Sequence, residues 1–201
     1  MMGASRVISA LVLASQSPRR RELLTSLGVE IDVVPSLYRE TDLPGTSPLE
    51  LARTHARGKA LEVRLRRPEA VVVGADTVVD VDGTALGKPG GPGEAASMLR
   101  TLSGRAHLVH TAFAVADGAE LIEREATTEV RFYSLSERDI EAYVATGDPF
   151  DKAGAYGIQG RGAALVDRIE GDFYTVMGFP LGLFVRTLAA RGLTLAAVGA
   201  R

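Results

Sequence analysis

The spacing of hydrophobic positions predicts alternating strands and helices along most of the chain. Short apolar runs bounded by turn residues are typical of buried strands, and apolar residues that recur every three or four positions after a capping residue indicate helices. Strands are predicted over residues 8–14, 29–34, 70–74, 78–81, 84–86, 107–116, 121–133 and 164–169. Helices are predicted over residues 18–27, 48–66, 94–102, 136–146 and 180–191. Because both kinds of element are mixed throughout, the pattern indicates the α/β class.

Turn and capping residues define the ends of several of these elements. Ser17 and Ser47 each precede a proline, which is the order expected at the N-terminus of a helix. Asp82-Gly83 and Asp117-Gly118 lie between predicted strands and indicate tight turns of hairpins. The tail beyond Gly192 shows no further pattern and is expected to fray.

Length and charge narrow the class of protein. The chain has 201 residues, 46% of them hydrophobic, which is enough for a single domain over residues 1–201. With 23 basic and 25 acidic residues the net charge is -2, so there is no overall basic field for a nucleic acid or an anionic membrane, and neither partner is expected. Any charge that binds phosphate must therefore be local.

The absence of cysteine removes several kinds of chemistry. Disulfides, thiolate zinc sites and cysteine nucleophiles are excluded, and the composition suits a reducing compartment, so a cytoplasmic location is expected. No apolar stretch approaches the roughly 18 residues that a membrane helix requires.

The first candidate site lies where a predicted strand meets a helix. Ser15, Ser17, Arg19 and Arg20 surround the N-terminus of that helix, whose free N–H groups and dipole favour an anion. The two arginines add donors whose geometry suits phosphate. The alternative is a capped surface helix with solvated arginines.

Two further charged residues follow apolar strands. Asp76 comes at the end of the predicted strand 70–74, where open α/β sheets bind their ligands, and could hold a divalent ion or accept a proton from water. An isolated aspartate at such a place more often caps a turn. Lys88 stands on a turn beside a proline and could neutralise a phosphate, although a lone lysine in a loop is usually solvated.

The glycine-rich segment 148–162 is a candidate ligand-binding loop. Its glycines allow a ligand to approach the backbone closely, and Lys152 adds a positive charge. Gln159 offers one donor and one acceptor on a single planar group, which complements the N3–H and O4 edge of uracil or thymine.

The three histidines argue against an imidazole metal site. His107 and His110 are three positions apart in a predicted strand, so their side chains point to opposite faces. His55 stands alone on a helix and is more typical of a half-buried or surface residue than of a zinc ligand. Hard oxygen ligands, and hence magnesium or manganese, suit this sequence better.

Taken together, these segments resemble the Maf family of nucleotide pyrophosphatases. The resemblance runs in order from Leu13 to about Leu183 and so covers most of the chain. The matching segments are LASQSPRRRELL at 13–24, GADTVV at 74–79, GKP at 87–89, LSGRAHLVHT at 102–111, DKAGAYGIQG at 151–160 and GDFYTVMGFPL at 171–181.

This resemblance implies a fold and an activity. The family fold is an elongated, two-lobed, ITPase-like α/β structure with a central mixed β-sheet and a cleft between the lobes, often as a homodimer. Its members use a divalent cation, here Mg or Mn, to hydrolyse nucleoside triphosphates to the monophosphate and pyrophosphate. Arg19, Thr77 and Gln159 match the branch that acts on dTTP and UTP, and modified pyrimidine nucleotides are also possible substrates.

The resemblance also assigns roles to residues. Asp76 matches the catalytic base, and Glu40 matches a second metal ligand by its spacing alone. Lys88 and Lys152 would stabilise the charge that develops on the departing pyrophosphate. One departure is expected, because His55 is aligned with a lysine that the family usually has near the active site. Either Arg53, Arg57 or Lys59 replaces that lysine, or the activity is reduced.

Three alternative functions remain open at this point. A 7-methyl-GTP pyrophosphatase would use the same chemistry on another base. A septum-formation inhibitor would act by binding, a role associated with the family through division arrest. A sugar-nucleotide pyrophosphorylase also begins with a strand, a turn and an arginine, but usually has a glycine-rich loop where this chain has Ser15-Gln16-Ser17.

Overall fold

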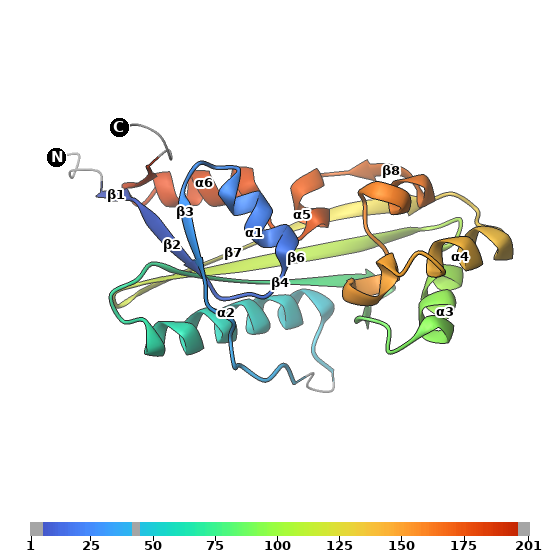
Figure 1. Ribbon diagram of the computed structural model, residues 1–201, viewed down its shortest axis with the longest axis horizontal. Helices are drawn as coiled ribbons and strands as arrows, with labels where there is room; N and C mark the ends of the chain where they lie inside the picture. Colours follow the sequence, from blue (N-terminus) through green and yellow to red (C-terminus); the bar gives the residue numbers. More distant parts are fainter. Residues whose placement is uncertain (1–5, 42–44, 197–201) are drawn as a thin grey trace.

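Three long strands run along the length of the molecule (Figure 1). The computed structural model describes residues 6–41 and 45–196, and within them β4 (Val72–Val81), β6 (Ala106–Asp117) and β7 (Glu120–Phe132) form the middle of a seven-stranded sheet. The sheet order is β3-β2-β4-β6-β7-β8, with β5 paired to β4. The shorter strands are β2 (Ala10–Leu13), β3 (Glu30–Val33), β5 (Thr84–Leu86) and β8 (Val166–Glu170). Strand β2 pairs in parallel with β3 and β4, and the other pairs are antiparallel, so the sheet is mixed as predicted.

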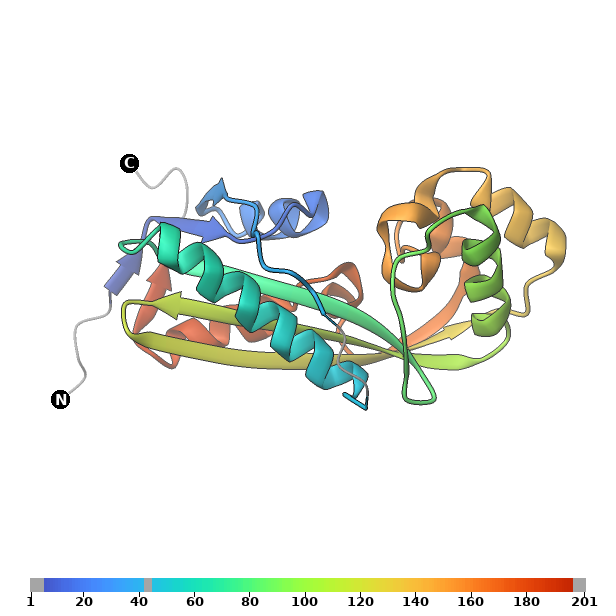
Figure 2. The ribbon, with the colours of Figure 1, turned by 90° about the horizontal axis from the view of Figure 1, so that it is seen from below.

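Helices cover both faces of the long strands and collect at one end (Figures 1 and 2). Helix α2 (Pro48–Arg66) lies along one face, and α1 (Pro18–Thr25), α5 (Phe173–Met177) and α6 (Leu181–Ala189) lie on the other. The far end holds α3 (Pro92–Leu102), α4 (Glu137–Val144) and the 3-10 helices η1 (Asp148–Asp151), η2 (Ala153–Ala155) and η3 (Gly160–Leu165). We call the end with β2, β3, α1 and α6 the first lobe and the end with α3, α4 and the 3-10 helices the second lobe.

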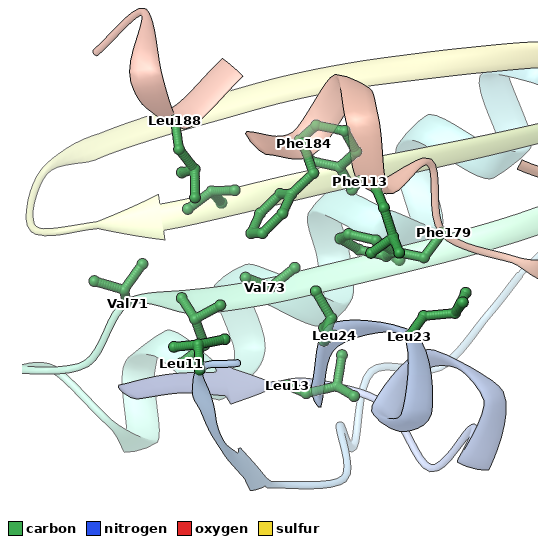
Figure 3. Packing of buried hydrophobic residues seen from close by; sticks show 14 of the residues in the cluster. Leu11, Leu13, Leu23, Leu24, Val71, Val73, Phe113, Phe179, Phe184 and Leu188 are labelled. Atoms are coloured by element: carbon green, nitrogen blue, oxygen red, sulfur yellow. The ribbon is translucent and has the colours of Figure 1, made fainter. Parts of the chain in front are cut away.

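Each lobe has its own hydrophobic cluster, and the long strands contribute to both. In the first lobe Phe113 packs against Phe179 and Phe184, with ring centroids 5.6 and 5.5 Å away, above Leu11 and Leu13 of β2 (Figure 3). The cluster of the second lobe includes side chains from β4, β6, β7, α3, α4 and the loop between η2 and η3: Val79, Leu99, Val109, Val130, Phe132, Ile140 and Tyr156. The elongated, two-lobed shape is therefore held together by strands that run through both lobes.

One edge of β4 is only partly covered by strands. Along that edge β2 pairs with Val72 and Val73, and β5 pairs with Val79 to Val81. Within the described ranges no strand pairs with residues 74–78 on this edge, whereas β6 covers the opposite edge from Val72 to Asp80. The sheet thus has a gap between the end of β2 and the end of β5.

Side chains in the gap alternate between the two faces of β4. Gly74, Asp76 and Val78 face α2, and Val78 packs against its N-terminal turns. Ala75 belongs to the core of the first lobe, and Thr77 points to the same opposite face. The edge of β4 therefore presents Asp76 from one face and Thr77 from the other.

Helix α2 approaches β4 very closely at Gly74. A Cβ atom on Gly74 would lie 2.3 Å from the carbonyl oxygen of Ala56 and 2.6 Å from the backbone nitrogen of Ala60. Backbone atoms at these distances cannot turn aside as a flexible side chain can, so the absence of a side chain at Gly74 sets the separation of helix and strand.

Most of the predicted elements are confirmed, but three predictions are wrong. The strand predicted over 8–14 is broken at Ser9, because β1 (Arg6–Ile8) leaves the main sheet and pairs in parallel with β9 (Leu193–Leu195). Residues 193–195 are thus a strand rather than a frayed tail, and residues 197–201 lie outside the described ranges. The strands predicted over 70–74 and 78–81 are one continuous strand, so Asp76 lies in its middle rather than at its end.

Helix α5 did not appear in the sequence pattern. Its five residues are too few to show a helical period, and its start depends on the side chain of Asp172, which accepts a hydrogen bond from the Thr175 backbone at 2.7 Å. Among the described residues, no helix combines the length and apolar character needed to cross a membrane.

Replacement of Gly74 by alanine tests the close packing of α2. We expect Gly74→Ala to lower the free energy of unfolding by about 1–3 kcal/mol or more, since the new methyl group meets backbone. Urea unfolding at equilibrium measures this change. Gly93→Ala is the control, because no atom lies within 4 Å of a Cβ at that position in helix α3. Equal stability of the two variants would contradict the proposed role of Gly74.

Candidate active site

A cleft of about 900 Å³ opens at the gap in the edge of β4. Its walls come from both lobes, and every residue that the sequence singled out as a candidate catalytic, substrate or metal contact lines it: Ser15, Ser17, Arg19, Arg20, Glu40, Asp76, Thr77, Lys88, Lys152 and Gln159. The predicted cleft between the lobes is thus present, and the spaced motifs converge on it.

The local folding of three segments brings these residues to the cleft. Strand β2 ends at Leu13, and the chain turns at Ser15 into α1, whose N-cap Ser17 accepts a hydrogen bond from the Arg20 backbone. Strand β5 ends at Leu86, immediately before Lys88. The 148–162 loop joins this second wall through a hydrogen bond from Gly154 N to the carbonyl oxygen of Gly87, at 3.0 Å.

Asp76 and Glu40 share one ammonium group. Lys59 Nζ on α2 lies 2.6 Å from Asp76 Oδ1 and 2.6 Å from Glu40 Oε1. Asp76 and Lys59 are 8% and 9% exposed, so this contact lies in a largely dehydrated part of the cleft. Burial alone would raise the pKa of Glu40, but the hydrogen bond and charge of Lys59 outweigh it and lower the pKa.

Lys59, one of the three basic residues that could replace the lysine aligned with His55, lies beside the carboxylates of the cleft. His55 is 3% exposed, and its Nδ1 lies 3.4 Å from the hydroxyl of Tyr38. Lys59 is one helical turn further along α2 and contacts both carboxylates. The ammonium is therefore present, and His55 is a buried neighbour rather than its replacement.

The donor set of Asp76 and Glu40 fits a divalent cation of the magnesium type. No group of three or more His, Cys, Asp or Glu side chains suited to a metal exists among the described residues. Magnesium is nevertheless often held by one or two carboxylates together with phosphate oxygens of the substrate. Two carboxylates in a cleft with several cations match that kind of site.

Arg20 is a partly buried cation whose hydrogen-bond partners among the described residues are all neutral. Its Nε donates to the carbonyl oxygen of Gly178 at 2.9 Å, Nη1 to Ser15 Oγ at 3.3 Å and Nη2 to Thr77 Oγ1 at 3.0 Å. These contacts use three of the five N–H groups of a guanidinium and leave two. Burial lowers the pKa of Arg20, and the nearby Asp76 carboxylate opposes that effect. In the described part of the chain, no carboxylate forms an ion pair with Arg20.

Arg19 and Lys152 are joined by one carboxylate across the cleft. Asp151 Oδ2 accepts from Arg19 Nη1 at 2.7 Å, and Asp151 Oδ1 accepts from Lys152 Nζ at 2.6 Å. Lys152 also donates to the carbonyl oxygen of Asp148 at 2.6 Å. Burial acts to raise the pKa of Asp151, but the hydrogen bonds from Lys152 and Arg19 lower it. The carboxylate thus links α1 of the first lobe to η1 of the second.

Lys88 and Gln159 are exposed at the cleft. Neither side chain has a hydrogen-bond or ion-pair partner within residues 6–41 and 45–196, so both are accessible to a ligand. No group in these two described ranges fixes which way the amide of Gln159 is turned.

Sequence reasoning missed the contacts that organise these residues. Lys59 was only one of three possible substitutes for a lysine, because its place depends on how α2 lies on β4. Asp151 was noted only as part of a motif, since nothing in the sequence places it against Arg19. The available signals were the charge of both residues and the position of Asp151 within the matching segment 151–160.

The two histidines of β6 point to opposite faces, as predicted. His110 contacts Thr127 and Asp80, at 2.8 and 3.1 Å. His107 is buried in the second lobe, where its Nε2 lies 2.7 Å from the hydroxyl of Tyr156, a residue that lines the cleft. Its Nδ1 has no hydrogen-bond partner in the described structure. Burial and, secondarily, the charge of Arg105 lower the pKa of His107 to about 4.

The geometry of the cleft defines a class of protein. A cleft in a mixed α/β sheet that gathers five basic side chains around carboxylates suited to a divalent cation is typical of proteins that bind polyphosphates. The family model described as Maf-like protein matches residues 10–191. The chain therefore belongs to the Maf family.

Relatives from several bacteria support this assignment. A protein of Bacillus velezensis named dTTP/UTP pyrophosphatase is 49% identical over 178 residues, covering 89% of this chain and 94% of that protein. Proteins with the same name from Symbiobacterium thermophilum and Thermus thermophilus are 48% and 49% identical, over 94% and 90% of this chain and 98% and 95% of their own lengths.

A solved structure of a HAM1 protein from Coxiella burnetii is 17% identical, with a TM-score of 0.48 over 91% of this chain and 100% of that chain.

The depressed pKa of His107 gives a prediction for pH. The unfolded chain binds a proton near the usual pKa of 6.5, whereas the folded protein does so only near 4, so unfolding is favoured as the pH falls through this window. We expect the free energy of unfolding to drop by up to about 3 kcal/mol between these limits. His107→Gln should flatten this part of the curve, measured by urea unfolding at a series of pH values. If the free energy of unfolding depends on pH in the same way in both proteins, the lowered pKa of His107 is contradicted.

Proposed function

We propose that this protein hydrolyses dTTP and UTP, and related modified pyrimidine nucleotides, to the nucleoside monophosphate and pyrophosphate. Membership of the Maf family and the names of the relatives support this activity. The observation that carries it is the partly buried Arg20, which forms no ion pair with a carboxylate in the described structure and lines the cleft together with Asp76. A partly buried cation that has no ion-pair partner is stabilised when an anionic ligand binds beside it.

The phosphates are bound by the first motif and by the second wall of the cleft. Ser15, Ser17 and the arginines Arg19 and Arg20 contact the triphosphate at the start of α1, where backbone N–H groups add to the positive potential. Lys88 and Lys152 lie on the opposite wall and stabilise the charge of the departing pyrophosphate. Lys152 and Arg19 exchange their contact with Asp151 for contacts with the substrate.

Asp76 accepts the proton of the attacking water. A water oxygen bonds to the α-phosphorus while the bond from that phosphorus to the bridging oxygen breaks, and the electron pair of that bond leaves with the pyrophosphate. The proton of the water passes to the carboxylate of Asp76. Lys59 keeps this carboxylate in place from α2, with Glu40 as the second anion on the same ammonium.

Asp76 and Glu40 would hold the divalent cation, magnesium or manganese, together with oxygens of the substrate. When bound, such a cation neutralises phosphate charge and makes a water more acidic. The carboxylates and the basic residues of this chain position both reactants in the cleft.

The base is read by the 148–162 loop. Gln159 is exposed at the cleft, and its amide can donate to O4 and accept from N3–H of uracil or thymine. Thr77 contributes to substrate binding from the edge of β4. We further propose that residues 1–201 act as one domain, that the protein is cytoplasmic and that it forms a homodimer.

Pyrophosphate release from a panel of nucleotides tests the function directly. We expect turnover of dTTP and UTP by the purified protein with magnesium or manganese, and much less with CTP, GTP or 7-methyl-GTP. Turnover mainly of 7-methyl-GTP would keep the chemistry and overturn the choice of base. Release from none of the five would contradict the proposed activity.

Asp76→Asn tests the assignment of the base. The amide cannot accept the proton, so we expect nearly all turnover to be lost while a nucleotide still binds, as isothermal titration calorimetry would show. Asp80→Asn is the control, because Asp80 lies on the same strand and face but hydrogen bonds to His110 and Gly83 instead of lining the cleft. Substantial turnover by Asp76→Asn would exclude Asp76 as the base.

A further inference from the structure

A row of threonine hydroxyls leads from the cleft into the interior of the protein. Thr77 on β4 lines the cleft, and Thr111 lies directly opposite it on β6. Their hydroxyl oxygens are 2.9 Å apart, and Thr111 Oγ1 is 2.7 Å from the carbonyl oxygen of Thr175 on α5. Thr111 is fully buried at 0% exposure and does not line the cleft. It therefore contacts the site only through other residues.

The chemistry of the two ends fixes the direction of these hydrogen bonds. An arginine N–H can only donate, and a carbonyl oxygen can only accept. Thr77 accepts from Arg20 Nη2, and Thr111 donates to the carbonyl oxygen of Thr175, so the hydrogen between the two hydroxyls must belong to Thr77. Thr111 thus holds the Thr77 hydroxyl with its hydrogen directed inwards and a lone pair directed towards Arg20.

Helix α5 gives Thr111 a second route to Arg20. Gly178 at the end of this helix accepts from Arg20 Nε at 2.9 Å. A helix of five residues is too short to be stable alone, so its position depends on its contacts with the sheet. Those contacts include the bond from Thr111 to Thr175 and the two bonds between Thr128 and the backbone of Asp172. Two of the three hydrogen bonds of Arg20 therefore depend on elements that Thr111 contacts.

We propose that Thr111 is a positioning residue of the active site, which orients the guanidinium of Arg20 through Thr77 and α5 without touching the substrate. The part that Arg20 plays in catalysis rests on the proposed function. A fixed orientation matters because the remaining donors of Arg20 must already face the phosphate when the substrate arrives.

Thr111→Val removes the hydroxyl and keeps the shape of the side chain. We expect kcat/KM for dTTP to fall by about tenfold to hundredfold, which is the scale of a small misplacement of a phosphate-binding group. Thr111→Ser keeps a hydroxyl that can accept and donate, and should restore most of the activity. A value of kcat/KM for Thr111→Val equal to that of the unmodified protein would overturn the proposal.

Thr128→Val is the matched control for loss of a buried threonine. Thr128 is also 0% exposed, and it contacts Asp172 at the start of α5, away from Arg20. This variant should lower the melting temperature and lower kcat/KM clearly less than Thr111→Val does, because the hydrogen bonds of Thr111 to Thr77 and Thr175 remain. If it lowers kcat/KM as much as Thr111→Val does, a general loosening of α5 explains the result and the specific role of Thr111 is wrong.

A double-mutant cycle tests whether Thr77 and Thr111 act on Arg20 through one connected series of hydrogen bonds or independently of each other. Thr77→Val breaks the same chain from the cleft side, so the double variant should lose little more activity than the more impaired single variant. Losses in kcat/KM that multiply would overturn the proposal. Should Thr111→Val fail to fold, Thr77→Val and Thr111→Ser still provide the comparison.

Side-chain NMR of Arg20 tests the orientation without reference to turnover. A guanidinium held on both sides rotates slowly and gives separate Nη signals, which Arg20→Lys would assign. We expect these signals to be separate in the unmodified protein and averaged in Thr111→Val. Identical signals in the two proteins would overturn the proposal. If the unmodified protein released no pyrophosphate, the proposed function would fail, and these spectra would still decide the role of Thr111.

Discussion

The contact between helix α2 and strand β4 at Gly74 fixes the geometry on which the site depends. Because Gly74 has no side chain, the backbone of the helix lies against the strand. Lys59 of the helix therefore reaches Asp76, which is two residues after Gly74 on β4. A larger separation would leave a dehydrated carboxylate without its counterion, which is costly in surroundings that exclude water. Packing and electrostatics are thus coupled here, since the same helix that covers the strand also supplies the charge that allows Asp76 to be buried.

The cleft itself follows from a mismatch in the lengths of neighbouring strands. Strand β4 has ten residues, but its neighbours on one edge, β2 and β5, have four and three. The uncovered segment of β4 lies between the ends of these short strands. A segment with charged residues follows each of the two strands in the sequence. Residues that are far apart in the sequence, such as Arg20 and Lys88, therefore reach one cleft. The long strands β6 and β7 on the other edge keep the two lobes joined despite this gap.

Local signals in the sequence were enough to predict most helices and strands and to select residues that line the cleft. Pro18 and Pro48 begin helices where expected, and Asp82-Gly83 forms the predicted hairpin, because capping and turn geometry depend on neighbouring residues alone. All ten predicted site residues line the cleft. The failures concern contacts set by the packing of distant elements. Nothing in the sequence shows that β4 continues through Gly74, that Lys59 rather than His55 reaches Asp76, or that a threonine in an ordinary strand contacts α5.

The ion pair between Arg19 and Asp151 spans the cleft from one lobe to the other, in a chain that contains neither cysteine nor tryptophan. Any thiol or indole introduced beside this pair would be the sole probe of its kind in the protein. A pair of cysteines, one on α1 and one near η1, could carry spin labels or a fluorescent donor and acceptor without background labelling. The distance between the two lobes in solution, and its response to a bound nucleotide, is therefore open to direct spectroscopic measurement in this protein.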